Sequence, residues 1–170
     1  TDKAWVNLRE CIACPKCQMN SRMRLIFTAI RLSRDQSAGE FRILERITPL
    51  FVLLQAEYPN IRGCEFIADD LPSGSVRQVH GVDVEHQDLL NLSYADGSLD
   101  LLVPGDVLEH VPDHKRALEE AARVIKPGGQ MIFTCPFYDH FDEHLIRCRI
   151  ENGVLNHYEP PAYHGNPMSE

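Results

Sequence analysis

The stretch between residues 88 and 137 most constrains the fold, because it reads as strand, loop, long amphipathic helix, turn and strand without interruption. Residues 99–103 form a short continuous apolar run, which is typical of a parallel strand covered on both faces. Asp113 stands where a helix N-cap belongs, and the helix is expected to stop at Pro127-Gly128-Gly129. Residues 131–134 then predict a second buried strand. The unit is a right-handed βαβ crossover, which predicts an α/β fold with a doubly wound, mainly parallel sheet.

The rest of the chain supplies further elements of such a fold. The sequence predicts strands at residues 41–45, 62–67 and 82–86, and a β-hairpin at residues 144–157 around the turn Asn152-Gly153. Thr48 followed by Pro49 is a strong start signal for a helix over residues 49–58. Ser21 can cap an earlier helix, whose buried face is expected to hold Leu25, Ile26, Ala29 and Ile30.

Composition narrows the class of protein and its partners. At 170 residues the chain is about one domain and long enough to bury a core without disulfides. It has no apolar run near the ~20 residues that cross a bilayer, so we expect no membrane partner and a cytoplasmic location. The formal charge is −8, with 17 Lys and Arg against 25 Asp and Glu. This balance disfavours binding to phosphate backbones, so no nucleic-acid partner is expected.

Four runs of residues carry a family resemblance. In chain order they read DGSLD, LLVPGDVLEHVPD, RVIKPGG and MIFTCPF, and they resemble the type 11 group of class I S-adenosylmethionine-dependent methyltransferases. A generic βαβ unit has no reason to carry LEHVPD or KPGG. The resemblance implies a Rossmann-like domain that binds S-adenosylmethionine and transfers its methyl group to a small-molecule or glycan acceptor. Nothing in the sequence indicates the oligomeric state.

The N-terminal segment carries three cysteines, Cys11, Cys14 and Cys17, at a spacing that favours thiolate ligation of a metal in a reducing compartment. Tetrahedral zinc needs four ligands, and no second pair is present. With the nearby NSRMR, the segment resembles the head of a methyltransferase subgroup whose other cysteine pair lies upstream. Two alternatives therefore stay open: half of a zinc site, or a site in which Cys11 is a third ligand.

These features divide the chain into two predicted parts. Residues 1–38 are expected to form an appendage made of a half zinc-ribbon-like segment and a helix. Residues 39–170 are expected to form the methyltransferase domain. Because the subgroup continues with two more strands after the segment that this chain ends on, the sheet is expected to lack its last strands.

Acidic residues near strand ends are the first candidates for cofactor binding. Glu65 follows the second strand and can accept two hydrogen bonds from a ribose diol, an interpretation that its spacing of about twenty residues from the first strand favours. The alternative is an exposed edge carboxylate. The resemblance implies that Asp88 accepts from the adenine amino group and that the neighbouring backbone N–H, that of Leu89, contacts the ring.

The loop after the first strand departs from the glycine-rich turn of most such methyltransferases. It reads Glu45-Arg46-Ile47-Thr48-Pro49, which agrees with the E-x-x-TP pattern of the subgroup. With Thr48 as N-cap, the following helix can present backbone N–H groups to a carboxylate such as the methionine end of the cofactor. Glu45 and Thr48 are therefore candidate cofactor residues. The alternative is a turn that only joins strand to helix, without tight cofactor binding.

Asp106 and His110 are the candidate catalytic bases, because they follow the fourth strand, where open α/β sheets bind ligands. Asp106 is also a candidate cofactor contact. The alternative is that Asp106 caps a short helix and His110 only packs beneath it. Two other functions stay open for the chain: a non-catalytic scaffold that lost cofactor binding with its glycines, and a zinc-dependent binding module.

Overall fold

The computed structural model describes residues 12–33, 39–136, 143 and 145–160. Within them, a six-stranded sheet has the strand order β3-β4-β2-β1-β5-β6. Its strands are β1 (Phe41–Ile43), β2 (Ile61–Glu65), β3 (Val76–Val79), β4 (Val82–His86), β5 (Leu99–Val103) and β6 (Ile125–Met131). The helices are α1 (Ser21–Leu32), α2 (Pro49–Glu57) and α3 (His114–Val124). None of them is long and apolar enough to cross a membrane.

Neighbouring strands in this sheet run parallel except for β3, which pairs antiparallel with β4 at the edge. β1 is central, with Phe41 opposite Ile61 on β2 and opposite Leu101 on β5. The chain builds outward from β1 through β2 to β4, and then crosses back to β5 on the other side. The predicted doubly wound, mainly parallel α/β fold is confirmed. The reversal at β1 and β5 is the switch point at which such sheets bind ligands, outside the carboxyl ends of the strands.

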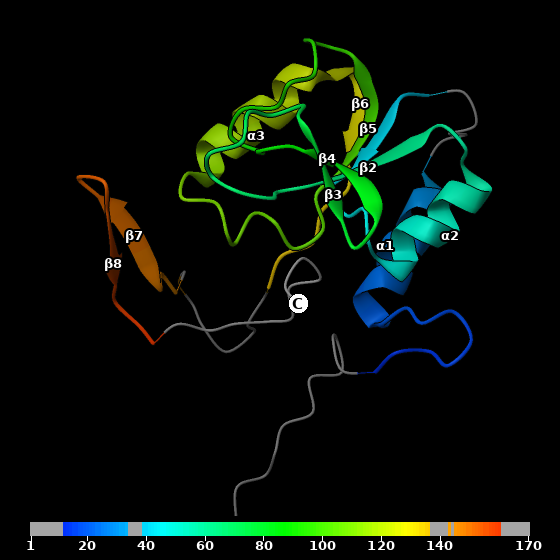
Figure 1. Ribbon diagram of the computed structural model, residues 1–170, viewed down its shortest axis with the longest axis horizontal. Helices are drawn as coiled ribbons and strands as arrows, with labels where there is room; N and C mark the ends of the chain where they lie inside the picture. The colour runs from blue at the N-terminus through cyan, green and yellow to red at the C-terminus, as the bar shows by residue number, and fades with distance from the viewer. Residues whose placement is uncertain (1–11, 34–38, 137–142, 144, 161–170) are drawn as a thin grey trace, which may run out of the picture.

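Helices cover both faces of the sheet (Figure 1). On one face, α1 and α2 pack in a single core cluster with Phe41 and Ile43 of β1. On the other face, Ala117 and Ala121 of α3 pack with Leu102 of β5. α1 is therefore part of the same core as the sheet. This packing places the first turn of α1 near the carboxyl end of β1.

The helix starts follow the predicted capping rules with one correction. Phe51 N–H donates to Thr48 Oγ1 at 3.3 Å, and Arg116 N–H donates to Asp113 Oδ1 at 3.0 Å, so both predicted caps are confirmed. The predicted cap of α1 was wrong, because Met23 N–H donates at 2.9 Å to the side chain of Asn20 instead of Ser21. The buried face of α1 is also narrower than predicted. Leu25 is 64% exposed, and Ile26 and Ile30 are the residues that enter the core.

The end of α3 differs from the prediction. The helix stops at Val124, and β6 begins at the next residue and runs through Pro127-Gly128-Gly129. Leu99 pairs with Ile125 and Leu101 with Gln130, so the register shifts between these pairs and the predicted turn residues form an irregularity inside the strand. Gly128 has φ 83°, a conformation that a side chain disfavours.

The two hairpins show one missed element and one confirmed element. β3 was not predicted, because Val76–Val79 lies mostly exposed at the sheet edge and shows little apolar alternation. It joins β4 through His80-Gly81, whose φ values of 49° and 77° suit a tight two-residue turn. The predicted C-terminal hairpin is confirmed as β7 (Cys148–Glu151) and β8 (Val154–His157), which pair with each other in a separate two-stranded sheet.

Candidate functional site

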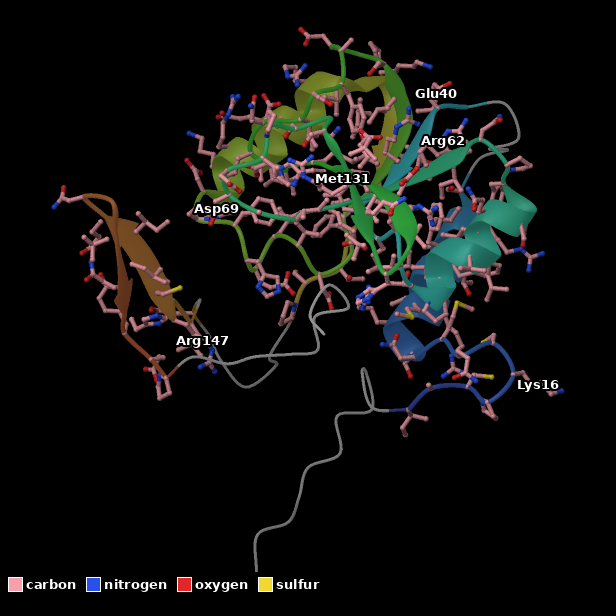
Figure 2. The ribbon with its side chains drawn as sticks, viewed as in Figure 1. Lys16, Glu40, Arg62, Asp69, Met131 and Arg147 are labelled. Atoms are coloured by element: carbon pink, nitrogen blue, oxygen red, sulfur yellow. The ribbon has the colours of Figure 1, made fainter. Side chains whose placement is uncertain are left out.

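Two carboxylates meet at the carboxyl ends of the central strands, and an arginine from α1 joins them. Arg22 Nη1 lies 2.5 Å from Glu45 Oε1, just beyond β1, and Arg22 Nε lies 3.2 Å from Asp106 Oδ2, just beyond β5. The side chains are only 10% exposed for Arg22, 6% for Glu45 and 8% for Asp106. This Glu45–Arg22–Asp106 cluster lies at the switch point of the sheet, at the carboxyl ends of the strands. Glu40 and Arg62, which Figure 2 labels, lie toward the amino ends of β1 and β2. Sequence reasoning missed Arg22.

The two carboxylate oxygens of Glu45 differ in their hydrogen bonding. Its Oε1 accepts from Arg22, but its Oε2 is buried and has no hydrogen-bond partner among the residues that the structure describes. Burial raises the pKa of Glu45, and the Arg22 guanidinium and the Thr48 side chain oppose that shift. A buried polar atom without a partner is unfavourable, so a hydrogen-bond donor brought to Oε2 by a ligand would be stabilising.

Asp106 is held from two sides. Its backbone has φ 52°, and its N–H donates to the Thr134 carbonyl oxygen at 3.1 Å. The Thr134 hydroxyl donates to Asp106 Oδ1 at 2.8 Å, while Oδ2 faces Arg22. Both carboxylate oxygens are therefore engaged. These contacts fix the orientation of the Asp106 carboxylate.

Gly105 makes room for the cluster. A Cβ at this position would overlap Glu45 Oε1 and lie 2.8 Å from Arg22 Nη1. A side chain at this position would therefore force the Glu45 and Arg22 side chains to shift. The loop after β1 has no glycine of its own, so the close approach at the switch point comes from the neighbouring strand.

Glu65 shapes the loop after β1. Its Oε1 accepts from the backbone N–H of Arg46 at 2.7 Å and is 3.4 Å from that of Ile47. Burial raises the pKa of Glu65 to about 7, although these two N–H groups oppose the shift. Among the described residues, no group donates to the second oxygen, Oε2. Glu65 thus holds the loop with one oxygen and keeps an acceptor for a ligand on the other.

Asp88 and Leu89 form a rigid turn after β4. Asp88 Oδ1 accepts from the Leu90 N–H at 2.9 Å, and Asp88 N–H donates to Ser73 Oγ at 3.0 Å. The Leu89 side chain is buried in the core cluster on the α3 side. The turn fixes the direction of the Asp88 carboxylate, which is half-buried. Its role toward adenine stays a prediction.

His110 is exposed, in contrast to the buried residues of the cluster. Its backbone N–H donates to the Val107 carbonyl oxygen at 3.0 Å. The structure thus brings Glu45 and Asp106 together through Arg22, and Glu65 to the adjoining loop. The predicted pairing of Asp106 and His110 as catalytic residues stays a prediction.

Cys14 and Cys17 share a tight turn before α1, around Lys16, which Figure 2 labels. Gln18 N–H donates to the Cys14 carbonyl oxygen at 2.8 Å and closes the turn. The pKa of the Cys14 thiol is lowered, first by the backbone N–H of Cys17 and then by that of Lys16. Cys11 lies outside the described residues. Within the part of the chain that the structure describes, no three His, Cys, Asp or Glu side chains form a metal site.

Two solved structures share part of this architecture. One is a chain of the complex between the Haloferax volcanii Trm112 methyltransferase activator and a methyltransferase. Its TM-score is 0.42 and its identity 20%, and the match covers 64% of this chain and 50% of that chain. The other is an S-adenosyl-L-methionine-dependent methyltransferase from Methanococcus maripaludis, with a TM-score of 0.44, 18% identity, and coverage of 69% and 58%. At such scores the likeness is partial, and the fold assignment comes from the strand order described above.

Sequence comparison is more informative. A 37.1 kDa protein in transposon TN4556 of Streptomyces fradiae is 43% identical over 87 residues, which are 44% of this chain and 25% of that protein. The demethylmenaquinone methyltransferases of Bacillus velezensis and Staphylococcus haemolyticus are 34% and 35% identical over 42% of this chain. The chain spans only 33% and 31% of those two enzymes. The family described as methyltransferase domain, type 11, matches residues 53–133. Residues 53–133 of this chain therefore match the methyltransferase domain of the type 11 family.

Proposed function

We propose that the protein transfers the methyl group of S-adenosylmethionine to a small-molecule or glycan acceptor. The observation that carries this proposal is the family match over residues 53–133. The acidic side chains of Glu45 and Glu65 at the carboxyl ends of adjacent parallel strands support it, because this edge is where open α/β sheets hold nucleotide-like ligands. Among the described residues nothing donates to the buried Oε2 of Glu45, which supports a ligand with a hydrogen-bond donor at this place.

Each part of the cofactor has a candidate partner. Glu65 Oε2 would accept from the ribose hydroxyls, the Asp88 carboxylate from the adenine amino group, and the Leu89 N–H would face the ring. Thr48 caps α2, whose N-terminal turn adds positive potential beside Glu45. When bound, S-adenosylmethionine supplies an electrophilic methyl group on its sulfonium. The protein's part is then to orient the acceptor, exclude water, and take up the acceptor's proton where there is one.

Asp106 and His110 are the residues that we propose for that proton. Asp106 is already oriented by Thr134 and Arg22, which suits a group that receives a proton in a fixed direction. His110 is exposed on the segment that follows, where it would be reached by an acceptor entering from solvent. A hydroxyl acceptor needs such a base, since it loses its proton as it is methylated.

A ligand comparison tests the proposed function. S-Adenosylhomocysteine is expected to raise the thermal unfolding midpoint of the protein at concentrations above its Kd, because a ligand that binds only the folded state stabilises it. Nicotinamide adenine dinucleotide contains the same adenosine but lacks the amino-acid end, and it is expected to leave the midpoint unchanged. Stabilisation by the dinucleotide alone would instead indicate a different class of nucleotide-binding enzyme.

The raised pKa of Glu65 predicts a pH-dependent cofactor affinity. Ribose hydroxyls donate to the ionised carboxylate, so binding favours loss of the proton that Glu65 holds below a pKa of about 7. Affinity for S-adenosylhomocysteine should therefore rise with pH through 7 and fall about tenfold between pH 8 and pH 6. Calorimetry on the wild-type protein and on Glu65→Gln measures this, and an identical pH profile in the two proteins would contradict the role of Glu65.

We propose that Cys14 and Cys17 contribute two thiolate ligands to a zinc ion. The lowered pKa of Cys14 supports this, because zinc binds the thiolate and the N–H groups of the turn stabilise that form. Because two thiolates supply only half of a tetrahedral site, we expect less than one zinc per chain in the 170-residue protein. Elemental analysis should show a lower content in Cys14→Ser and no change in the control Cys148→Ser. A zinc content that is the same in all three proteins would exclude this turn as the binding site.

A further inference from the structure

The connection between β2 and β4 leaves one flank of α2 uncovered. Neighbouring parallel strands are usually joined by a crossover helix, which covers the face of the sheet. Here residues 66–81 contain no helix, and β3 instead pairs with β4 as an antiparallel edge strand. The turn between β3 and β4 lies close to α2 (Figure 1). Val52 on this flank of α2 is accordingly 62% exposed.

A groove of about 630 Å³ opens along this flank, between α2, the β3–β4 turn and the turn that carries Cys14 and Cys17. Its volume is within the range of small-molecule sites. The walls come from the loop after β1, from α2 and from β4, and their apolar residues are Ile47, Pro49, Val52, Leu53 and Val82. Such walls favour a ligand with an apolar body. Of the residues proposed for the cofactor, only Thr48 borders the groove.

The polar rim of the groove is basic. Lys16 and Arg46 border it with positive charge and His80 with an imidazole, whereas no Asp or Glu of the described residues does. Among those residues, no carboxylate forms an ion pair with Lys16 or Arg46. The Arg46 guanidinium lies 4.6 Å from the centroid of the Phe51 ring, a contact that holds it in place. In a chain of formal charge −8, this local positive charge favours an anionic ligand.

The loop after β1 connects the groove to the proposed cofactor residues. The Arg46 N–H donates to Glu65 Oε1 at 2.7 Å, and the same residue borders the groove. We propose that the groove binds the methyl acceptor, and that this acceptor is a small molecule with an apolar body and a carboxylate or phosphate group. This inference rests on the proposed function and extends it to the class of acceptor.

The anionic group serves recognition, and another oxygen or nitrogen of the acceptor receives the methyl group. A bond forms between that atom and the methyl carbon, while the bond from this carbon to the sulfonium sulfur breaks. The electron pair of the broken bond stays on sulfur, so S-adenosylhomocysteine leaves. The proton of the acceptor passes to a base of the protein or to solvent.

The test uses three probes with the same alkyl chain. Octanoate and octyl phosphate carry an anionic group, and octylammonium carries a cation. Calorimetry is expected to show tighter binding of both anions than of octylammonium. Arg46→Gln and Lys16→Gln should each lower the affinity for the anions about 3- to 10-fold, the range for charged contacts at a partly exposed site. Arg62→Gln, an exposed arginine outside the groove (Figure 2), is the matched control and should change neither.

Two variants guard against a folding defect. Arg46→Lys keeps the charge and should retain most of the anion affinity, and Lys16→Gln changes an exposed turn residue, so it decides if Arg46→Gln is unfolded by circular dichroism. Equal affinity for octylammonium and the anions, or no loss in Lys16→Gln and Arg46→Gln, would overturn the groove as an anion site. The comparison of octanoate with octyl phosphate shows which anion the groove prefers.

Two further measurements assign the groove to the acceptor. Octanoate should bind in the presence of saturating S-adenosylhomocysteine, and displacement of that ligand would overturn the assignment. With methyl-labelled S-adenosylmethionine and small molecules extracted from cells that make the protein, the labelled products should be anions, and Arg46→Gln should form them more slowly. Label in neutral or cationic products alone would overturn the acceptor class. A protein that binds S-adenosylhomocysteine but neither anion overturns this inference only, whereas failure to bind S-adenosylhomocysteine overturns the proposed function.

Discussion

Replacing His110 with Ala or Asp106 with Asn is expected to lower methyl-transfer turnover by about 10²–10⁴, and His110→Ala is expected to change cofactor affinity no more than a few-fold. The reason is that a general base acts on the proton of the acceptor and leaves the adenosine contacts alone. Asp106 has both oxygens engaged by Thr134 and Arg22, so its replacement also weakens the packing of the cluster. Single-turnover methyl transfer to a hydroxyl acceptor measures the effect.

Folding stability has to be measured on the same two variants. If Asp106 and His110 serve only the local structure, unfolding becomes easier and the chemical step is unchanged. His114→Ala is a suitable control, because His114 is exposed at the start of α3 and has no proposed role. A variant that unfolds more readily and still transfers methyl groups at the wild-type rate would remove that residue from the mechanism.

Glu65→Ala is expected to weaken binding of S-adenosylhomocysteine by about 1.5–3 kcal/mol, the range for hydrogen bonds to charged groups. The replacement removes the acceptor for the ribose. It also releases the backbone N–H groups of Arg46 and Ile47, so the loop after β1 loses the contact that holds it. Calorimetric titration of the variant and the wild-type protein gives the difference in binding free energy.

Glu40→Ala is the matched control for Glu65→Ala. Glu40 precedes β1 at the opposite edge of the same sheet, so its loss should leave cofactor affinity unchanged. An affinity that is the same in wild type and Glu65→Ala would contradict the ribose assignment. Glu65 is buried at the carboxyl ends of the strands, whereas Glu40 is exposed at their amino ends. Comparing the two variants therefore separates an effect on the site from a general effect of removing a carboxylate.

The order of the main elements could be predicted because short apolar runs and capping residues are local signals. Thr48 and Asp113 identified helix starts correctly, and residues 82–86 became β4 as predicted. The errors occurred where a tertiary contact decided between two local solutions. α3 stops at Val124 because the next residue pairs with β5, although the helical spacing of apolar residues continues to Ile125.

The candidate site was predictable only in part, for a related physical reason. Parallel strands end at one edge of a sheet, so the acidic residues that follow them, Glu45, Glu65 and Asp106, could be assigned to that edge from the sequence. Arg22 could not, because a charged residue near a helix start is usually solvated, and only the docking of α1 brings it to Glu45. The double role of Glu65 as a loop anchor likewise depends on backbone groups that carry no sequence signal.

Hydrogen–deuterium exchange with and without S-adenosylhomocysteine tests most directly whether a cofactor binds at the carboxyl ends of β1, β2, β4 and β5. Bound ligand slows exchange where it orders the backbone or shields it from local opening. We predict increased protection in the segments that follow these strands, residues 45–49, 65–68, 88–90 and 104–107, and in the first turn of α1. Protection confined to other segments, or none at ligand concentrations that saturate methyltransferases of this family, would contradict the account.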